Sequence, residues 1–192
     1  MSDGSLGRFS GRGRSEFEVP VALAGKTLLA EAWGRVLSQG FTVEGDYREG
    51  NAVLREWVGQ SGWGNEKAHI VIPPKYKTLV ISKGGRNPGR WHLSLSELTD
   101  APKLSVESSG TTSRVYSYLG EKTEAEVDFE GNGAVWFSDF RWRRRQKLIG
   151  HTGKFRGTIV IPGPGLVAVT GGHGGALAWG SQPGWKVILS PA

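Results

Sequence analysis

The sequence predicts an all-β protein made of two tandem, related antiparallel β-sandwich units of a jelly-roll-like kind, packed together. Thirty glycines and nine prolines make turn-forming residues about a fifth of the 192-residue chain. They are spread between β-branched and aromatic residues, which is typical of many short strands joined by tight turns. Short blocks of the first half also recur, in the same order, in the second half.

The recurring blocks indicate an internal duplication. The matched blocks, first copy and then second copy, are Val58–Gly62 with Ile149–Gly153, Ile70–Pro73 with Ile159–Pro162, Leu79–Ile81 with Leu166–Val169, and Pro88–Leu95 with Pro183–Leu189. Three of the offsets are 91, 89 and 94 residues, so order and spacing both hold. Any two β-hairpins share apolar alternation and glycine turns, which could explain one match but hardly a whole ordered series.

The front of each copy matches more weakly. Phe9–Gly11 resembles Tyr118–Gly120, and Phe17–Val19 resembles Val127–Phe129, at offsets of 109 and 110 residues. These matches predict that the first copy is longer in its front half by about 18 residues.

Within each copy the apolar residues alternate as a half-buried strand requires. Trp91, Leu93 and Leu95 do so in the first copy, and the segment from Trp185 does so in the second. Because Trp91 and Trp185 occupy matching positions, we predict that both belong to the core. Residues 22–36 could form a helix, but a likeness of 26–30 to 77–81 favours a strand.

The repeat predicts the domain boundaries. We expect a first unit over residues 1–98, a surface linker over 99–111 that is rich in Ser, Thr and Asp, and a second unit over 112–192. Leu104 and Val106 could form a short strand within the linker. Sandwiches of this size have small cores, so the two units are expected to pack together.

The order of these motifs resembles that of a jelly-roll-like β-sandwich which recurs in bacterial proteins as an accessory domain. The motifs are an aromatic-x-Gly opening, a Phe-x-Val strand, a Val-Gly-x-Ser-Gly turn, a Leu-x-Ile strand and a Gly-x-Trp-x-Leu ending. They are short and common, and they cover most of both copies. The resemblance implies an accessory or binding role and supplies no catalytic residues.

The sequence carries no pattern typical of catalysis or metal binding, so we expect neither an enzyme nor a cofactor. There is no Cys, and the four His residues lack metal-ligand spacing. His69 and His92 fall at polar positions of predicted strands and are expected to face solvent. The glycine-rich segment Gly171–Gly175 lacks the nucleophile that an oxyanion loop serves.

Residues 1–14 are polar and glycine-rich, with no signal-peptide core, and no segment is long and apolar enough to span a membrane. A cytoplasmic location is therefore the default expectation, and the oligomeric state stays open.

A basic run is the sharpest local feature. Residues 141–156 contain seven basic residues and no acidic ones. The run begins with Arg141, Trp142, Arg143, Arg144 and Arg145. Basic residues beside aromatic ones can bind nucleic acid. Two structural interpretations are favoured instead: a charged strand that protects a sheet edge, and pairing with acidic side chains of the preceding strand. Those acidic residues are Glu121, Glu124, Glu126, Asp128 and Glu130.

Eight tryptophans are many for this length. Six lack a partner in the other copy: Trp33, Trp57, Trp63, Trp136, Trp142 and Trp179. Aromatic platforms bind glycans and mark protein interfaces. The first expectation for function is therefore a non-enzymatic module that engages a protein or a glycan through exposed aromatic residues. The alternative is binding of nucleic acid or another polyanion through residues 141–156. The candidate binding residues are Trp136, Trp142, Arg141, Arg143, Arg144 and Arg145.

Overall fold

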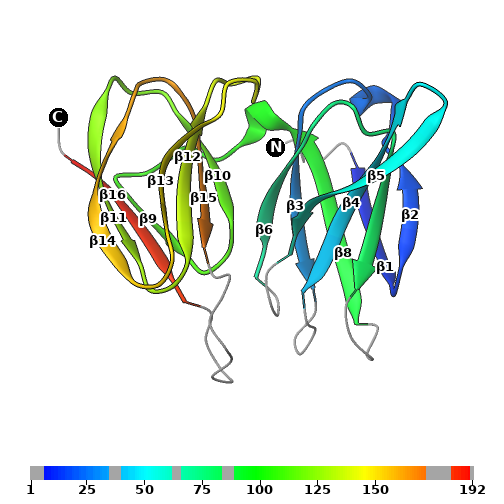
Figure 1. The fold of residues 1–192 in the computed structure, drawn as a ribbon, viewed down its shortest axis with the longest axis horizontal. Coiled ribbons are helices and arrows are strands. Elements are labelled where there is room, and N and C mark those ends of the chain that lie inside the picture. The colour runs from blue at the N-terminus through cyan, green and yellow to red at the C-terminus, as the bar shows by residue number, and fades with distance from the viewer. Residues whose placement is uncertain (1–6, 35–39, 62–65, 84–88, 172–182, 191–192) are drawn as a thin grey trace. The chain divides into compact units, whose positions relative to one another are not determined.

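The computed structural model describes residues 7–34, 40–61, 66–83, 89–171 and 183–190. The fold class is confirmed, because the chain forms two all-β units, Met1–Asp100 and Ala101–Ala192. Each unit is a sandwich of two four-stranded antiparallel sheets (Figure 1). No helix in the described residues is long and apolar enough to cross a membrane.

Within its described residues, the first unit contains eight strands and two short 3₁₀ helices. They are β1 (Gly7–Arg12), β2 (Ser15–Glu18), η1 (Val21–Leu23), β3 (Leu28–Gly34), β4 (Phe41–Glu49), β5 (Ala52–Gln60), β6 (Ala68–Ile72), β7 (Thr78–Lys83), β8 (Arg90–Glu97) and η2 (Leu98–Asp100). Their order is β1-β8-β3-β6 in one sheet and β2-β7-β4-β5 in the other. Residues 28–34 form a strand, as the sequence favoured.

The described part of the second unit also contains eight strands. They are β9 (Glu107–Gly110), β10 (Arg114–Tyr118), β11 (Thr123–Phe129), β12 (Gly133–Ser138), β13 (Gln146–His151), β14 (Phe155–Ile161), β15 (Gly165–Gly171) and β16 (Trp185–Leu189). One sheet has the order β14-β11-β16-β9, and the other has the order β10-β15-β12-β13.

The two units share one connectivity, so the duplication is confirmed at the level of topology. When the strands of each unit are numbered one to eight, both units have sheets of order 1-8-3-6 and 2-7-4-5. This eight-stranded, two-sheet arrangement is a jelly roll. The registers agree as well. Ala30 faces Ile70 and Leu95, while Ala125 faces Ile159 and Leu189 in the equivalent strands.

The predicted match of the front halves is wrong. Gly11 lies in β1, whereas Gly120 follows β10, which is the counterpart of β2. The true counterpart of Gly11 is Gly110, because these glycines face Trp91 and Trp185 across equivalent strand pairs. The first unit is therefore only five residues longer between this glycine and the tryptophan.

A shared β-bulge corrects the match near residue 58 by one position. The register shifts after Val43 in β4 and after Val135 in β12. Gly59 faces Val43, and Ile149 faces Val135, so Gly59 corresponds to Ile149 rather than to Gly150. This one-residue correction decides which side chains of β5 and β13 are equivalent.

The structure also differs from the predicted linker over residues 99–111. The boundary between the units falls between Asp100 and Ala101. Ala101 and Leu104 are buried, and residues 107–110 form β9, which pairs with β16. The polar composition of this segment conceals a strand, because an edge strand such as β9 buries few of its side chains.

The matched tryptophans anchor the two cores as predicted. Trp91 and Trp185 are each 2% exposed. The indole Nε1 of Trp91 donates to the carbonyl oxygen of Gly13 over 3.1 Å, and that of Trp185 donates to Thr112 over 2.8 Å. Each ring covers a glycine of the neighbouring strand, where a Cβ would lie 2.6 Å (Gly11) or 2.9 Å (Gly110) from the ring.

We predict that Trp91→Ala and Trp185→Ala each destabilise the protein by about 3–5 kcal/mol, because each leaves a cavity and an unpaired carbonyl. Denaturant unfolding followed by circular dichroism measures this loss. Trp57→Ala is the matched control, because Trp57 is 62% exposed, and its effect should stay within about 0.5 kcal/mol. Equal effects of all three substitutions would show that the paired tryptophans are not anchors.

Candidate functional site

The basic run begins as an irregular loop and not as the strand that the sequence suggested. Residues 139–145 join β12 to β13. The Oδ1 atom of Asp139 accepts hydrogen bonds from the backbone N–H of Arg141 over 3.2 Å and of Arg143 over 2.8 Å. The N–H of Trp142 donates to the Asp139 carbonyl over 3.0 Å. These bonds fold the chain around the carboxylate, so alternation along a strand does not apply here.

The same bonds perturb the acidity of Asp139. The N–H of Arg143 contributes most to a pKa below the ordinary value of 3.8, while partial desolvation opposes the shift. Two backbone N–H groups, two residues apart, thus point at one anion. In this loop the anion is a side chain of the protein itself.

Trp142 has a strained backbone, with a φ angle of 59°. It is the only non-glycine residue with positive φ among those that the structure describes. This conformation is an outlier for a bulky residue and costs roughly 1–2 kcal/mol. Strain of this kind persists only where its surroundings impose it, and it is common at functional sites.

The structure brings five of the six candidate residues together in this loop. Arg141, Arg143, Arg144 and Arg145 are exposed, and Trp142 is half-buried. The sixth candidate, Trp136, is half-buried in β12, on the face of the sheet that points away from the core. Phe140, which is 40% exposed in the same loop, was not among the candidates predicted from the sequence. The one feature of the sequence that pointed to Phe140 is its position directly before the basic run.

The predicted pairing of the basic run with the acidic residues is confirmed only at the end of the run. Those acidic residues flank or lie in β11, which belongs to the other sheet of the unit. The end of the basic run does reach them, through Arg156 of β14, whose guanidinium lies 3.4 Å from Glu126. Among the described residues, no ion pair involves Arg143, Arg144 or Arg145.

The duplication gives Arg145 a counterpart in the first unit. Arg55 faces Asp46 in the β4–β5 ladder. By the shared register, Gln146 aligns with Glu56, so Arg145, which directly precedes Gln146, aligns with Arg55, and Ser138 aligns with Asp46. Arg55 holds both carboxylate oxygens of Asp46 at 2.6 Å, and it also reaches Glu16 at 3.4 Å. The bond from Arg55 lowers the pKa of Asp46, which is almost fully buried.

The acidic residues of this face are absent from the second unit. Four acidic positions of this face become neutral in the second unit, namely Glu16 to Val115, Glu18 to Ser117, Glu44 to Trp136, and Asp46 to Ser138. Meanwhile the cation is retained at Arg145, and Trp57 is replaced by Lys147. One duplicated face is thus acidic and internally paired in the first unit and basic in the second.

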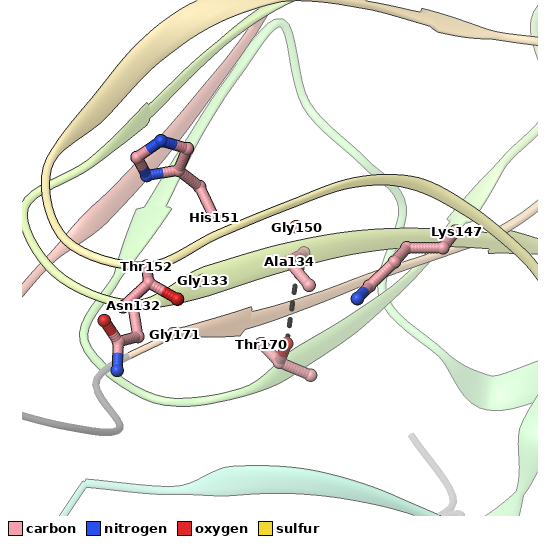
Figure 2. A pocket seen from close by; sticks show the side chains of 9 residues that line it. All are labelled: Asn132, Gly133, Ala134, Lys147, Gly150, His151, Thr152, Thr170 and Gly171. Carbon is pink, nitrogen blue, oxygen red and sulfur yellow. Dashed lines mark hydrogen bonds between the residues drawn. The ribbon is translucent and has the colours of Figure 1, made fainter.

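A shallow hollow of about 380 Å³ lies along the β12–β13 hairpin (Figure 2). Its lining contains no carboxylate and consists of Asn132, Gly133, Ala134, Lys147, Gly150, His151, Thr152, Thr170 and Gly171. Figure 2 shows the Lys147 side chain extending toward Ala134 and Thr170, with Asn132 and Thr152 at the other end. The Lys147 ammonium lies 5.2 Å from the centre of the Trp136 ring.

A polar cluster around Tyr76 in the first unit is satisfied by contacts among its own members. Tyr76 donates to Glu56, which also pairs with Lys75, and the Lys75 ammonium lies 4.1 Å from the Tyr47 ring centre. Burial, followed by the bond to Glu56, raises the pKa of Tyr76. The Tyr76 ring also covers Gly45, so this cluster fastens a loop onto the sheet.

The three histidines that the structure describes do not form a cluster. His69 is buried, contrary to the expectation from sequence, and His92 is half-buried with its ring stacked 5.2 Å from Trp33. His151 is exposed beside Phe155. Within the described ranges, no three His, Asp or Glu side chains could hold a metal ion. Most of the glycine-rich segment 171–175, with His173, lies outside the described residues, as do Trp63 and Trp179.

We predict that Asp139→Ala loosens the loop, because the N–H groups of Arg141 and Arg143 lose their acceptor. Amide hydrogen exchange at Arg143 should become faster while the core amides stay protected. Lowering the pH should loosen the loop in the same way, because protonation of Asp139 weakens it as a hydrogen-bond acceptor. A carboxylate with a depressed pKa stabilises the loop fully above pH 3.8, and this contribution is lost as the pH falls through the lower folded-state value. Glu121→Ala is the control, and unchanged exchange at Arg143 in Asp139→Ala would contradict the assignment.

Comparisons with known proteins add little. No family model matches the chain, and no curated protein matches it. Among solved structures, the chain is similar to the regulatory subunit of a cAMP-independent protein kinase A from Trypanosoma cruzi bound to guanosine, with 12% sequence identity. The match covers 86% of this chain and 71% of that chain, with a TM-score of 0.23. So low a TM-score supports no conclusion about fold or function.

Proposed function

We propose that the protein binds a polyanion, such as nucleic acid, through the arginine loop, defined as residues 139–145. The observation that carries the proposal is the reversal of charge between the duplicated faces. Arg55 is neutralised by Asp46 and Glu16, whereas for its counterpart Arg145 the aligned positions hold Ser138 and Val115 in place of the two acids. If Arg145 served only to hold strands together, as Arg55 does, we would expect it to have an acidic partner.

The chemistry of the loop suits phosphate groups. Guanidinium groups donate paired hydrogen bonds that match phosphate geometry, and they stay charged at any physiological pH. Four of them fall within five residues of exposed chain. Asp139 does not cancel their field fully, because it carries one negative charge against four arginines. The hydrogen bonds of its carboxylate leave the arginine side chains to project from a fixed backbone.

Edge protection accounts for only part of the basic run. β13 is an edge strand of its sheet, and Lys147 lies on it, as protection of an edge requires. The four arginines precede the strand and do not lie along its edge. Their concentration in a strained loop therefore favours a ligand.

We predict that the triple variant Arg143→Glu, Arg144→Glu, Arg145→Glu binds duplex DNA more weakly than the wild type. The slope of log K against log salt should flatten by about 0.9 for each phosphate that the variant no longer neutralises. Salt-titrated fluorescence anisotropy measures both quantities. The matched control is Arg48→Glu, Lys77→Glu, Lys122→Glu, which reverses three exposed charges elsewhere. Equal weakening in both variants, or a wild type that binds neither duplex DNA nor single-stranded DNA, polyphosphate or heparin, would refute the proposal.

The first unit supports a second candidate function, which is binding of a protein or a glycan to an aromatic surface. Trp57 is 62% exposed on the edge strand β5, and Val53 of the same strand is also 62% exposed. Arg55 points to the same face but is paired with Asp46. An exposed indole on an edge strand whose arginine is already neutralised favours contact with an uncharged partner.

We predict that a ligand of this surface changes the tryptophan fluorescence of the wild type, and that the change is insensitive to salt. Trp57→Ala should abolish it, whereas Trp33→Ala should not, since Trp33 is half-buried against His92. Screening of glycans by fluorescence titration tests the idea. A response that persists in Trp57→Ala would exclude this surface.

A further inference from the structure

We infer that the polyanion is a single-stranded nucleic acid, which runs along the β12–β13 hairpin from the arginine loop to the hollow beside Lys147. This inference rests on the proposed function and goes further, because it names the ligand class and adds Phe140, Lys147 and the hollow to the site. Three features of the hairpin carry it: aromatic rings among the cations, a donor-rich hollow, and the distance between them.

The first feature is the presence of aromatic rings within the arginine loop. Phe140 is 40% exposed between Asp139 and Arg141, and Trp142 is half-buried between two arginines. Exposed aromatic rings are unfavourable in water, and they contribute nothing to the binding of a phosphate group alone. Unpaired bases stack on such rings while cations hold the backbone between them. The positive φ of Trp142 sets the direction in which its side chain leaves the backbone relative to the arginines on either side.

The second feature is the chemistry of the hollow. Its polar side chains include the Lys147 ammonium, the hydroxyl of Thr152 and the amide of Asn132, whereas the Thr170 hydroxyl already donates to the carbonyl oxygen of Ala134 over 3.4 Å. The Oδ1 atom of Asn132 accepts from the N–H of Gly153 over 2.8 Å, so the NH₂ end of that amide remains to donate. A hollow with several donors and no carboxylate favours an anionic group.

Gly150 shapes this hollow through Lys147. A Cβ at Gly150 would lie 2.7 Å from both the Cε and Nζ atoms of Lys147. The lysine therefore lies down across the strand instead of extending into solvent. The electrostatic attraction between its ammonium and the Trp136 ring is weak at an exposed site, so a phosphate can draw the ammonium away and uncover the ring.

The third feature is the spacing. The hollow begins at Gly133, and the loop follows Ser138, at the opposite end of β12. Five steps along a strand span about 17 Å. Lys147 and Trp136 lie between these ends, facing each other across the β12–β13 ladder. Basic side chains and aromatic rings thus continue along the hairpin. This arrangement suits an extended single-stranded nucleic acid better than a compact anion.

This arrangement disfavours the other polyanions. A duplex hides the faces of its bases, so it cannot stack on Phe140 or Trp142. Polyphosphate and sulfated glycans carry no aromatic bases that would make these rings useful. Duplex DNA, polyphosphate and sulfated glycans could all bind the arginines through charge. The aromatic rings and the hollow, and not the charge of the loop, therefore distinguish single-stranded nucleic acid from these ligands.

The test compares a fluorescent oligothymidylate with a duplex of equal length by anisotropy, with polyphosphate and heparin as competitors. Phe140→Ala should weaken oligothymidylate binding roughly five- to 150-fold and leave duplex binding unchanged. Lys147→Gln should flatten the salt slope for the single strand by about 0.7, as expected when one phosphate is no longer neutralised. The controls are Leu119→Ala, which removes another exposed apolar side chain, and Lys122→Gln.

The outcomes separate this inference from the proposed function. If Phe140→Ala and Lys147→Gln bind the single strand like wild type while the triple arginine variant does not bind it, the inference fails and polyanion binding stands. Equal weakening for duplex and single strand in Phe140→Ala, or competition by polyphosphate as strong as by unlabelled single strand, also overturns it. If the wild type binds none of the four probes, the proposed function itself fails.

Discussion

The packing of one tryptophan against one glycine organises each sandwich. Trp91 and Trp185 cover Gly11 and Gly110 of the adjacent strand and donate to a carbonyl two residues beyond that glycine. Each indole also lies near an aromatic ring of the facing sheet, Phe17 in one unit and Tyr116 in the other, with ring centres 6.3 Å apart. A single side chain therefore fixes the register within a sheet and the distance between the sheets. Because a larger residue at the glycine would displace the ring, this packing constrains both strands at once.

A core held in this way leaves the outer faces free to diverge. The inward positions remain apolar in both copies, since every buried side chain must fit a closed core. The outward positions have no such constraint, and the face formed by β2, β7, β4 and β5 differs in charge from that formed by β10, β15, β12 and β13. The Asp46–Arg55 pair ties two strands together in the first unit. In the second unit the acid of this pair is replaced by Ser138, and the arginine that remains is the one we propose for the ligand.

The two hairpins at this position differ in backbone as well as in charge. β4 and β5 continue as a regular ladder to Glu49 and Ala52 and turn at Gly50, whose φ is 60°. The second unit replaces this tip with the arginine loop. There Asp139 binds backbone N–H groups, and a tryptophan adopts the conformation that glycine adopts in the first unit. The loop keeps its shape through one carboxylate that accepts from two backbone N–H groups and not through a ladder, so its side chains need not alternate between two faces.

The sequence by itself determined the strand content, the duplication and the two core tryptophans. These properties follow from period-two alternation and from the recurrence of apolar blocks, which are local or simply repeated. The front halves were misaligned because the signal they share, the pairs Ser10-Gly11 and Ser109-Gly110, is short and its copies lie 99 residues apart. The strand β9 was missed because its residues are polar. Only the tertiary structure decided that β11 lies in the other sheet from the arginine loop, that a bulge shifts β13 by one residue, and that Arg145 therefore takes the place of Arg55. The physical reason is that strand pairing and register arise from contacts between residues far apart in the chain, and a shift of one residue exchanges the two faces of a strand.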